Sequence, residues 1–590
     1  MTAKCLTFVL ISALVISLQS EAQQDLQAIK ARAEQGDALA QARLGMAYVE
    51  GDEFPQDYAE ASRWFRRAAD QGLALGQFGV GLMYEEGKGV PENHAEALKW
   101  YRLAAAQGEP LSQCKIGIAY SKGKDVPKDY VEALKWYRMA VEKGNASAQY
   151  YLGRAYSKGE GVQQDEAEAL TWYRKAAQQG HSDAQYWVGI AYDYGKGIEE
   201  DRDQAFKWYR MAANQGDPDG LFKLGVAYDT GRAVPQDKGE AIKWYRKAAE
   251  KGHAKSQFKL GLIYSKGEGV PKDAAQAARW YLKAADQGHE SAQYNLGHLY
   301  FGGRGVSKDY AEAVKWWRKA AEQGNANAQI ALGACYGQGK GVPEDQVESV
   351  KWYRKAAEMG HAVAQNSLGV AYDEGKGVPL DPAEAVKWYR KAAEQEYKRA
   401  QHNLGTNYYY GEGVPKNGSE AVKWWRKAAD QGHAGAMNSL GAVYRLGKIV
   451  PEDQAESVKW YRKAAEMGDA DSQNSLGLAY DKGRGVPLDH AECVKWYRKA
   501  AEQGNARGQY NLASKYVSGE GVTKDFVLAY MWYSLAIDQK HQVARKYRDR
   551  IAAEMTPEQI AEAEKLTREW KPSMQAEDRH PNYKSVASAE

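Results

Sequence analysis

Histidine is the residue type that most readily suggests metal chemistry here, because the chain has eleven of them and several recur at one interval. Five occur at one position of a 36-residue interval, namely His181, His253, His289, His361 and His433, and His541 continues the series. Zinc ligands lie about 2.0–2.1 Å from the metal. Residues on helices packed about 10 Å apart cannot share one ion. We expect polar residues that begin a helix at this position, and no metal site.

The sequence also lacks the spacings that carry catalysis. It contains no His-Glu-x-x-His, Gly-x-Ser-x-Gly, Cys-x-x-Cys or Walker-type motif. A Gly-x-Gly-Val-Pro segment recurs, but it lacks the preceding strand that a nucleotide-binding loop requires. We therefore predict no catalytic residue and no cofactor.

Variable residues around a recurring Leu-Gly pair are better candidates for binding. Three residues before that glycine, aromatic side chains in the first half of the chain give way mainly to asparagine in the second half, and four residues after it an aspartate recurs. Both positions fall on one side of a helix. The candidates, which we expect on a concave face, are Phe78, Tyr150, Tyr186, Asp193, Phe222, Asp229, Phe258, Tyr294, Asn366, Asp373, Asn438, Asn474 and Asp481. Exposed aromatic anchors with nearby carboxylates would suit a peptide partner. The alternative is that the rings pack against the adjacent repeat.

These residues are positioned by a unit of 36 residues that occurs fourteen times without insertion or deletion. Counted from the glycine of the Leu-Gly pair (the reference glycine, Gly45 in the first copy), every copy has Tyr at +3, Gly at +6, Asp or Asn at +12 and Trp at +19. A strict period of this length predicts a solenoid of stacked helix pairs.

Each unit encodes two helices, helix A around the reference glycine and helix B around the tryptophan. In the second copy, helix A is predicted from about Leu73 to Glu86, and Gly87 supplies its left-handed cap. Helix B is predicted from Asn93 to Gly108, and its N-cap is followed three residues later by Glu or Gln in thirteen of fourteen copies. This spacing predicts a reciprocal capping box.

Two packing predictions follow from the same pattern. The tryptophans are expected to fill the space between helices A and B. A glycine inside a helix costs about 1 kcal/mol relative to alanine, yet thirteen copies keep the reference glycine. We expect close contact with a neighbouring helix or with the tryptophan ring to offset that cost.

The phrase Ala-x-Ala-Gln-x-x-Leu-Gly-x-x-Tyr-x-x-Gly-x-Gly-Val-Pro-x-Asp-x-x-Glu-Ala-x-x-Trp-Tyr-Arg-Lys-Ala-Ala-Glu-x-Gly resembles the Sel-one-like repeat (SLR) family, relatives of the tetratricopeptide repeats. Residues 329–360 and 365–394 match it almost completely. The resemblance implies helical hairpins stacked into a right-handed superhelix, and a role in assembling protein complexes, often at a cell envelope or in the secretory pathway. Residues 531–570 resemble the C-terminal capping segment of such arrays.

The N-terminus differs in kind from the repeats. Lys4, an apolar run from Leu6 to Leu18 and small residues before Gln23 are typical of a cleavable secretory signal. An N-terminal membrane anchor is the alternative, but 13 apolar residues fall short of the roughly 20 that span a bilayer. We expect export to a periplasmic or extracellular space without stable membrane insertion.

The chain is nearly balanced in charge, with 80 Lys and Arg against 77 Asp and Glu, so no basic surface for nucleic acid is indicated. After signal removal three cysteines remain, Cys114, Cys335 and Cys493. They lie in distant repeats and are expected to be isolated, buried thiols, because a disulfide needs Cα atoms within about 7 Å.

We therefore predict an all-α solenoid with a signal peptide (1–22), a lead-in helix (23–36), fourteen repeats (37–540), C-terminal capping helices (541–570) and a disordered tail (571–590). The predicted function is a non-enzymatic scaffold for protein partners. A glycan- or peptidoglycan-binding protein, with tyrosines stacked on sugar rings, is the alternative. A hydrolase acting on β-lactams or the cell wall is disfavoured, because the paired cysteines of the family's cysteine-rich branch are missing.

Overall fold

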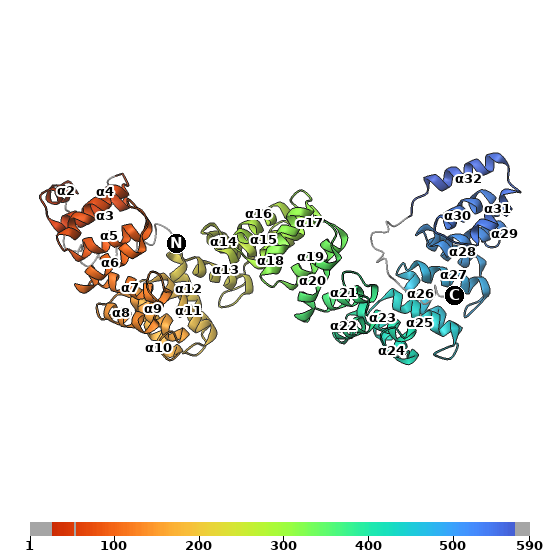
Figure 1. Ribbon diagram of the computed structural model, residues 1–590, viewed down its shortest axis with the longest axis horizontal. Coiled ribbons are helices and arrows are strands. Elements are labelled where there is room, and N and C mark those ends of the chain that lie inside the picture. Colours follow the sequence, from red (N-terminus) through yellow and green to blue (C-terminus); the bar gives the residue numbers. More distant parts are fainter. Residues whose placement is uncertain (1–25, 52–54, 573–590) are drawn as a thin grey trace. The chain divides into compact units, whose positions relative to one another are not determined.

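The computed structural model describes residues 26–51 and 55–572, and this part of the chain is entirely helical, with 31 helices and no strand. The helices form two compact units, the first ending at His289 and the second beginning at Glu290. Within each unit, consecutive helices pack in chain order (Figure 1). The prediction of an all-α solenoid is confirmed. The predicted signal peptide and the tail from residue 573 lie outside the described residues.

Fourteen helix pairs of uniform length follow the short helix α2 (Leu26–Glu34). The A helices are α3 (Ala38–Glu50), α5 (Ala74–Glu86), α7 (Pro110–Lys122), α9 (Ala146–Lys158), α11 (Ser182–Tyr194), α13 (Pro218–Thr230), α15 (Ala254–Lys266), α17 (Glu290–Gly302), α19 (Ala326–Gln338), α21 (Ala362–Glu374), α23 (Lys398–Tyr410), α25 (Ala434–Leu446), α27 (Ala470–Lys482) and α29 (Ala506–Ser518). The B helices are α4 (Tyr58–Asp70), α6 (His94–Ala106), α8 (Tyr130–Glu142), α10 (Glu166–Gln178), α12 (Arg202–Asn214), α14 (Lys238–Glu250), α16 (Ala274–Asp286), α18 (Tyr310–Glu322), α20 (Gln346–Glu358), α22 (Pro382–Glu394), α24 (Gly418–Asp430), α26 (Gln454–Glu466), α28 (His490–Glu502) and α30 (Phe526–Asp538). Helices α31 (Ala544–Ala552) and α32 (Pro557–Glu569) both pack on α30.

The helix ends follow the predicted signals with one correction. Gly87 ends α5 with φ 65°, and the Asn93 side chain accepts the Glu96 N–H at 3.0 Å. The reciprocal half of the capping box was predicted wrongly for the B helices, since among the described helices only α32 has it. The reason is that the N-cap N–H is already bound: Asn93 N–H donates to the Tyr84 carbonyl at 2.8 Å. The Glu96 carboxylate pairs with Lys99 instead.

The reference glycine makes room for an aromatic ring on helix B. A Cβ built on Gly225 would lie 2.5 Å from Cδ1 of Tyr245, which has 0 % exposure. The same position contacts a tyrosine in most repeats and a second tryptophan, Trp317 or Trp425, in two others. The expected close contact exists, but it is made by the residue at +20, which follows the recurring tryptophan.

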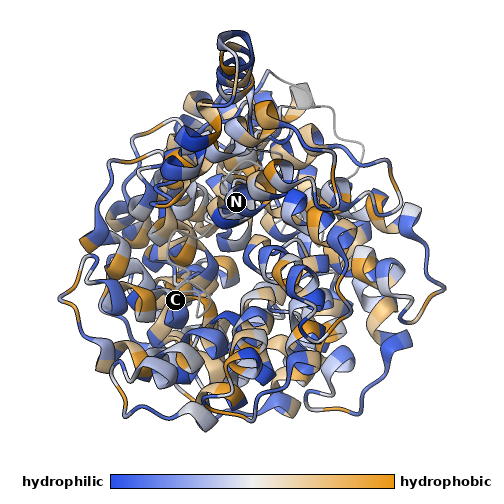
Figure 2. Ribbon diagram, turned by 90° about the vertical axis from the view of Figure 1, so that its right-hand side faces the viewer, coloured by the Kyte–Doolittle hydropathy of each residue, from blue (hydrophilic) through white to orange (hydrophobic). Residues whose placement is uncertain are grey.

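The recurring tryptophan at +19 packs at the contact between consecutive repeats, which we call a joint. Trp172, for example, packs on a buried cluster containing Leu134 of the preceding helix B and Leu152 of its own helix A. The Lys175 ammonium lies 4.0 Å above the Trp172 ring. Along the helices, polar and apolar residues are interspersed rather than gathered in one segment (Figure 2).

Polar contacts that the sequence pattern does not reveal also hold the repeats together. Arg174 Nη2 donates to the hydroxyl of Tyr192 in the next repeat at 2.7 Å. The same arginine–tyrosine contact occurs at nine joints. A buried glutamine of helix A, such as Gln185, accepts from Gln215 of its own helix B at 2.7 Å and donates to the preceding repeat's Ala177 carbonyl at 3.3 Å.

Candidate partner-binding site

The aromatic candidates at −3 lie on the A helices, and in repeats 4 to 7 they are half-buried. Each contacts the +20 tyrosine of its own repeat. The ring pairs are Tyr150–Tyr173, Tyr186–Tyr209, Phe222–Tyr245 and Phe258–Tyr281, with centroids 5.8–5.9 Å apart. Part of each ring therefore belongs to the packing within its own repeat.

Histidines of the following repeat cover several of the same rings. His181 stacks on Tyr150 with ring centroids 4.8 Å apart, and His289 stacks on Phe258 at 4.5 Å. The His181 Nδ1 atom also accepts the Ala184 N–H at 3.3 Å and so caps α11. Burial lowers the pKa of His181. The recurring histidines thus begin helices and stack on aromatic rings, which leaves less ring face for a sugar to stack on.

The aspartate candidates in the first unit are held by cations and tyrosine hydroxyls. Asp193 accepts from Lys223 of the next A helix at 3.0 Å and from the Tyr209 hydroxyl at 3.0 Å. Asp229 pairs with Lys238 at 2.5 Å and accepts from the Tyr245 hydroxyl at 3.3 Å. Asp193 is therefore held both within its repeat and across a joint, whereas both contacts of Asp229 lie within its own repeat.

In the second unit the equivalent positions form amide contacts. Asn366 accepts from Asn403 at 3.1 Å, and Asn474 accepts from Asn511 at 2.8 Å, each across one joint. Asp373 accepts from Asn407 at 3.4 Å. Tyr294 shares a 2.9 Å hydrogen bond with His298 one turn along the same helix.

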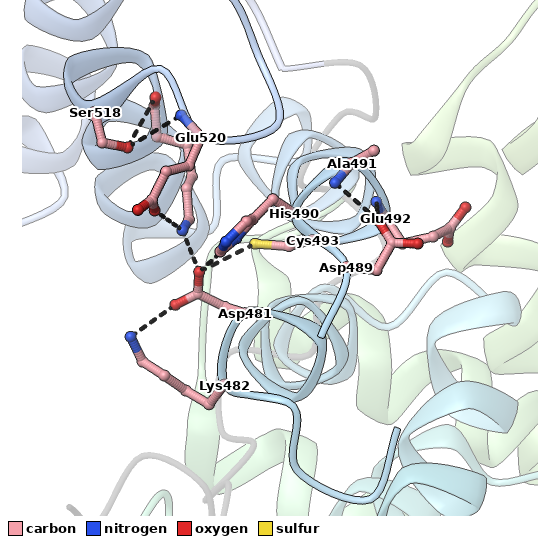
Figure 3. A network of polar contacts seen from close by, with 10 residues as sticks. Asp481, Lys482, Asp489, His490, Ala491, Glu492, Cys493, Ser518 and Glu520 are labelled. Carbon is pink, nitrogen blue, oxygen red and sulfur yellow. Dashed lines mark hydrogen bonds and ion pairs between the residues drawn. The ribbon is translucent and has the colours of Figure 1, made fainter. Parts of the chain in front are cut away.

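Asp481 is the centre of a denser network (Figure 3). Its carboxylate pairs with Lys515 of the next repeat and with Lys482, and it accepts from the Cys493 thiol at 3.8 Å. Asp481, His490 and Glu520 present ligand atoms within 4.8 Å of one another, the spacing of a metal site. However, the Lys515 ammonium binds both Asp481 and Glu520, at 2.7 Å to the latter. A divalent ion would have to displace that buried cation. The group is therefore an ion-pair network that joins Asp481 to Lys515 of the next repeat.

Two predicted residues are inaccessible. Phe78 and Asn438 both have 0 % exposure, and Phe78 belongs to the core of the first unit. A partner cannot touch either side chain in this conformation, so both serve packing. Asn366 and Asn474 are each 8 % exposed.

Sequence reasoning overlooked the −2 position, where two consecutive repeats add a second aromatic residue. Tyr151 stacks on Tyr137 with centroids 5.5 Å apart, and Trp187 stacks on Tyr173 at 6.0 Å. Most other repeats carry a polar or small residue here, so the substitution is a readable signal. We call the half-buried residues Tyr150, Tyr151, Tyr186, Trp187 and Phe222 the aromatic surface.

Fourteen consecutive segments match the family model described as the Sel1 repeat: 38–73, 74–109, 110–145, 146–181, 182–217, 218–253, 254–289, 290–325, 326–361, 362–397, 398–433, 434–469, 470–505 and 506–541. The chain belongs to the Sel1 repeat family. Sel1 repeat proteins are in general protein-interaction scaffolds rather than enzymes. No curated protein matches the chain.

One solved structure with an SLR fold agrees with this assignment. A protective antigen of uropathogenic Escherichia coli strains, which displays an SLR fold, is 36% identical over 74% of this chain and 94% of its own, with a TM-score of 0.67. A Sel1 repeat protein from Oxalobacter formigenes is 33% identical over 55% of this chain and 92% of its own, with a TM-score of 0.44.

Among the described residues, no helix is both long and apolar enough to cross a bilayer.

Proposed function

We propose that this Sel1 repeat protein is an exported scaffold that binds protein partners through its A helices, with the aromatic surface as the main contact in the first unit. The observation that carries the proposal is that repeats 4 and 5 each have two adjacent half-buried aromatic residues, Tyr150 with Tyr151 and Tyr186 with Trp187. Half-buried aromatic residues supply large contact area at a small cost in side-chain entropy.

Charged side chains beside this surface would select the partner. Asp183 and Arg154 are half-buried on α11 and α9, and Tyr194 is 62 % exposed with the Lys223 ammonium 4.8 Å above its ring. A partner segment that combines apolar side chains with charges of both signs would match these groups. Export is proposed from the apolar run at 6–18 and its flanking residues. Assembly of an envelope complex follows from the family's general role together with export.

Affinity capture from the native envelope tests the proposal with matched variants. We expect the double variant Tyr151→Ala/Trp187→Ala to lose a partner that the unaltered chain retains. The control is Leu103→Ala/Met139→Ala on the B helices, where both side chains are exposed, at 50 % and 42 %. Equal loss in both variants, or retention in both, would contradict binding at the aromatic surface. Circular dichroism of each variant checks that the helices persist.

A further inference from the structure

We propose that a groove between repeats 1 and 2 binds a carboxylate that carries a short, branched apolar group. The groove has a volume of about 430 Å³ and lies between α4 and the helix and loop of the next repeat, α5 and Gly89-Val90. This volume falls within the range of small-ligand sites, about 300–1,000 Å³. It involves α4, a B helix, and none of the residues of the aromatic surface.

The groove is open at this joint because of Ser62. In twelve of the other thirteen repeats the equivalent residue is a larger apolar or aromatic residue, and repeat 7 has Ala278. Leu98 and Leu170, for example, are buried in the core. Serine lacks most of the volume of leucine, so the space that leucine fills elsewhere is left open here. Ser62 lines the groove and is 9 % exposed. Its hydroxyl can donate one hydrogen bond to a ligand in the groove and accept others.

A second difference opens the other wall. At nine joints an arginine of helix B donates to the tyrosine hydroxyl of the next repeat, as Arg174 does to Tyr192. Arg66 occupies the equivalent position, but it pairs with Asp70 at 2.9 Å and lies 4.8 Å above the Trp100 ring. Tyr84 lines the groove, and Arg66 does not hold it as Arg174 holds Tyr192.

The wall chemistry selects an anion with an apolar body. Arg63, Arg66 and Arg67 all line the groove, and no other repeat has arginine at all three positions. Two carboxylates, Glu60 and Asp70, pair with the first two, so a net positive charge remains. A guanidinium matches a carboxylate in a two-point contact.

The floor of the groove is formed in part by Val80, which is 2 % exposed, and Val90. An apolar floor beneath cationic groups fits a branched aliphatic acid better than an inorganic anion, because the aliphatic part gains free energy on leaving water. Such a carboxylate has two possible sources, the C-terminus of a polypeptide or a free short-chain acid.

Saturation-transfer NMR on the full chain tests the proposal with four probes: acetyl-Ala-Leu, its C-terminal amide, 4-methylpentanoate and inorganic phosphate. We expect at least one of the two organic acids to bind about tenfold more tightly than the amide and phosphate. Tighter binding of acetyl-Ala-Leu than of 4-methylpentanoate identifies a polypeptide C-terminus as the source, and the reverse order identifies a free acid. Equal binding of the amide or of phosphate, or no acid binding at about 10 mM, would overturn the proposal.

Two variants locate the site. Ser62→Leu restores the side chain that Leu98 provides in the next repeat, so it should abolish acid binding while leaving the melting temperature unchanged or raised. Lys135→Met, at the position in repeat 3 equivalent to Arg63, is the matched control and should bind normally. Unchanged binding in Ser62→Leu, despite a folded chain, would place the acid elsewhere and refute the assignment.

Discussion

Replacement of Gly225 by leucine tests the packing that sets the shape of every repeat. A Cβ at this position would lie 2.5 Å from Cδ1 and 2.6 Å from Cε1 of the Tyr245 ring. Tyr245 has 0 % exposure, so the ring cannot swing into solvent. Adding side-chain atoms to a filled core costs about 1–3 kcal/mol or more. Leucine has a higher helix propensity than glycine, which offsets somewhat under 1 kcal/mol of this cost.

Because the ring is fully enclosed, we place the cost at the upper end of this range, so the expected net loss for Gly225→Leu is about 2 kcal/mol. For a cooperative unit of 150–250 residues this corresponds to a decrease in melting temperature of about 4–8 °C. Circular dichroism at 222 nm and calorimetry provide the measurement. Gly239→Ala is the control, because Gly239 is exposed on α14 and an added Cβ would meet only the Asp237 side chain, at 3.2 Å.

A second substitution sharpens the test. If the clash with the ring causes the loss, Tyr245→Ala in the Gly225→Leu background should cost less than it does alone, because the two residues are in contact. An unchanged melting temperature for Gly225→Leu would refute the close-approach explanation. Strictly additive losses would show that the destabilisation arises elsewhere.

Three further outcomes follow from individual residues. Glu396 has φ 63° where most repeats have glycine, so Glu396→Gly should stabilise the chain by about 1 kcal/mol; a lower melting temperature would contradict this. Burial lowers the pKa of His402 to about 3 in the folded chain, whereas its pKa in the unfolded chain is about 6.5. Below pH 6.5, His402 therefore takes up a proton in the unfolded chain but remains neutral in the folded chain. Stability should therefore fall from pH 6.5 towards 3, by about 1.4 kcal/mol per pH unit from this group, and His402→Asn should flatten that slope in pH-dependent melting. Lys515→Met should destabilise the chain by about 1–3 kcal/mol, because it removes the buried partner of Asp481. Lys482→Met should change the melting temperature little, because the Lys482 side chain is 56 % exposed.

The architecture could be predicted from the sequence because the residues that end and begin each helix recur in every copy of the 36-residue unit. The glycine at +6 and the N-cap at +12 each set a helix end, and fourteen copies exclude a chance pattern. The capping box was predicted wrongly because it requires a free N–H at the N-cap, and only the three-dimensional arrangement shows that Tyr84 already binds the N–H of Asn93. The buried thiols Cys114, Cys335 and Cys493 are as predicted, since all three are free and buried.

The candidate site was less accessible to sequence reasoning. A helical wheel places the −3 and +4 positions on one side of helix A, but it does not show what the next repeat brings to that side. His181 covers Tyr150, and Lys223 reaches Asp193, from residues about 30 positions further along the chain. The groove beside Ser62 was missed because it depends on what is absent, a leucine side chain and an arginine–tyrosine hydrogen bond. Comparison of the +17 residues among the fourteen copies would have revealed the serine.

Site-specific photo-crosslinking tests the central claim, that the A helices carry the partner-binding surface, most directly. Benzoylphenylalanine in place of Trp187 keeps an aromatic ring at the aromatic surface, and the same residue in place of Leu103 reports from the exposed face of a B helix. In the native envelope, we predict a discrete crosslinked partner from position 187 and none from position 103. Crosslinks to that partner from position 103 alone, or equally from both, would contradict the account.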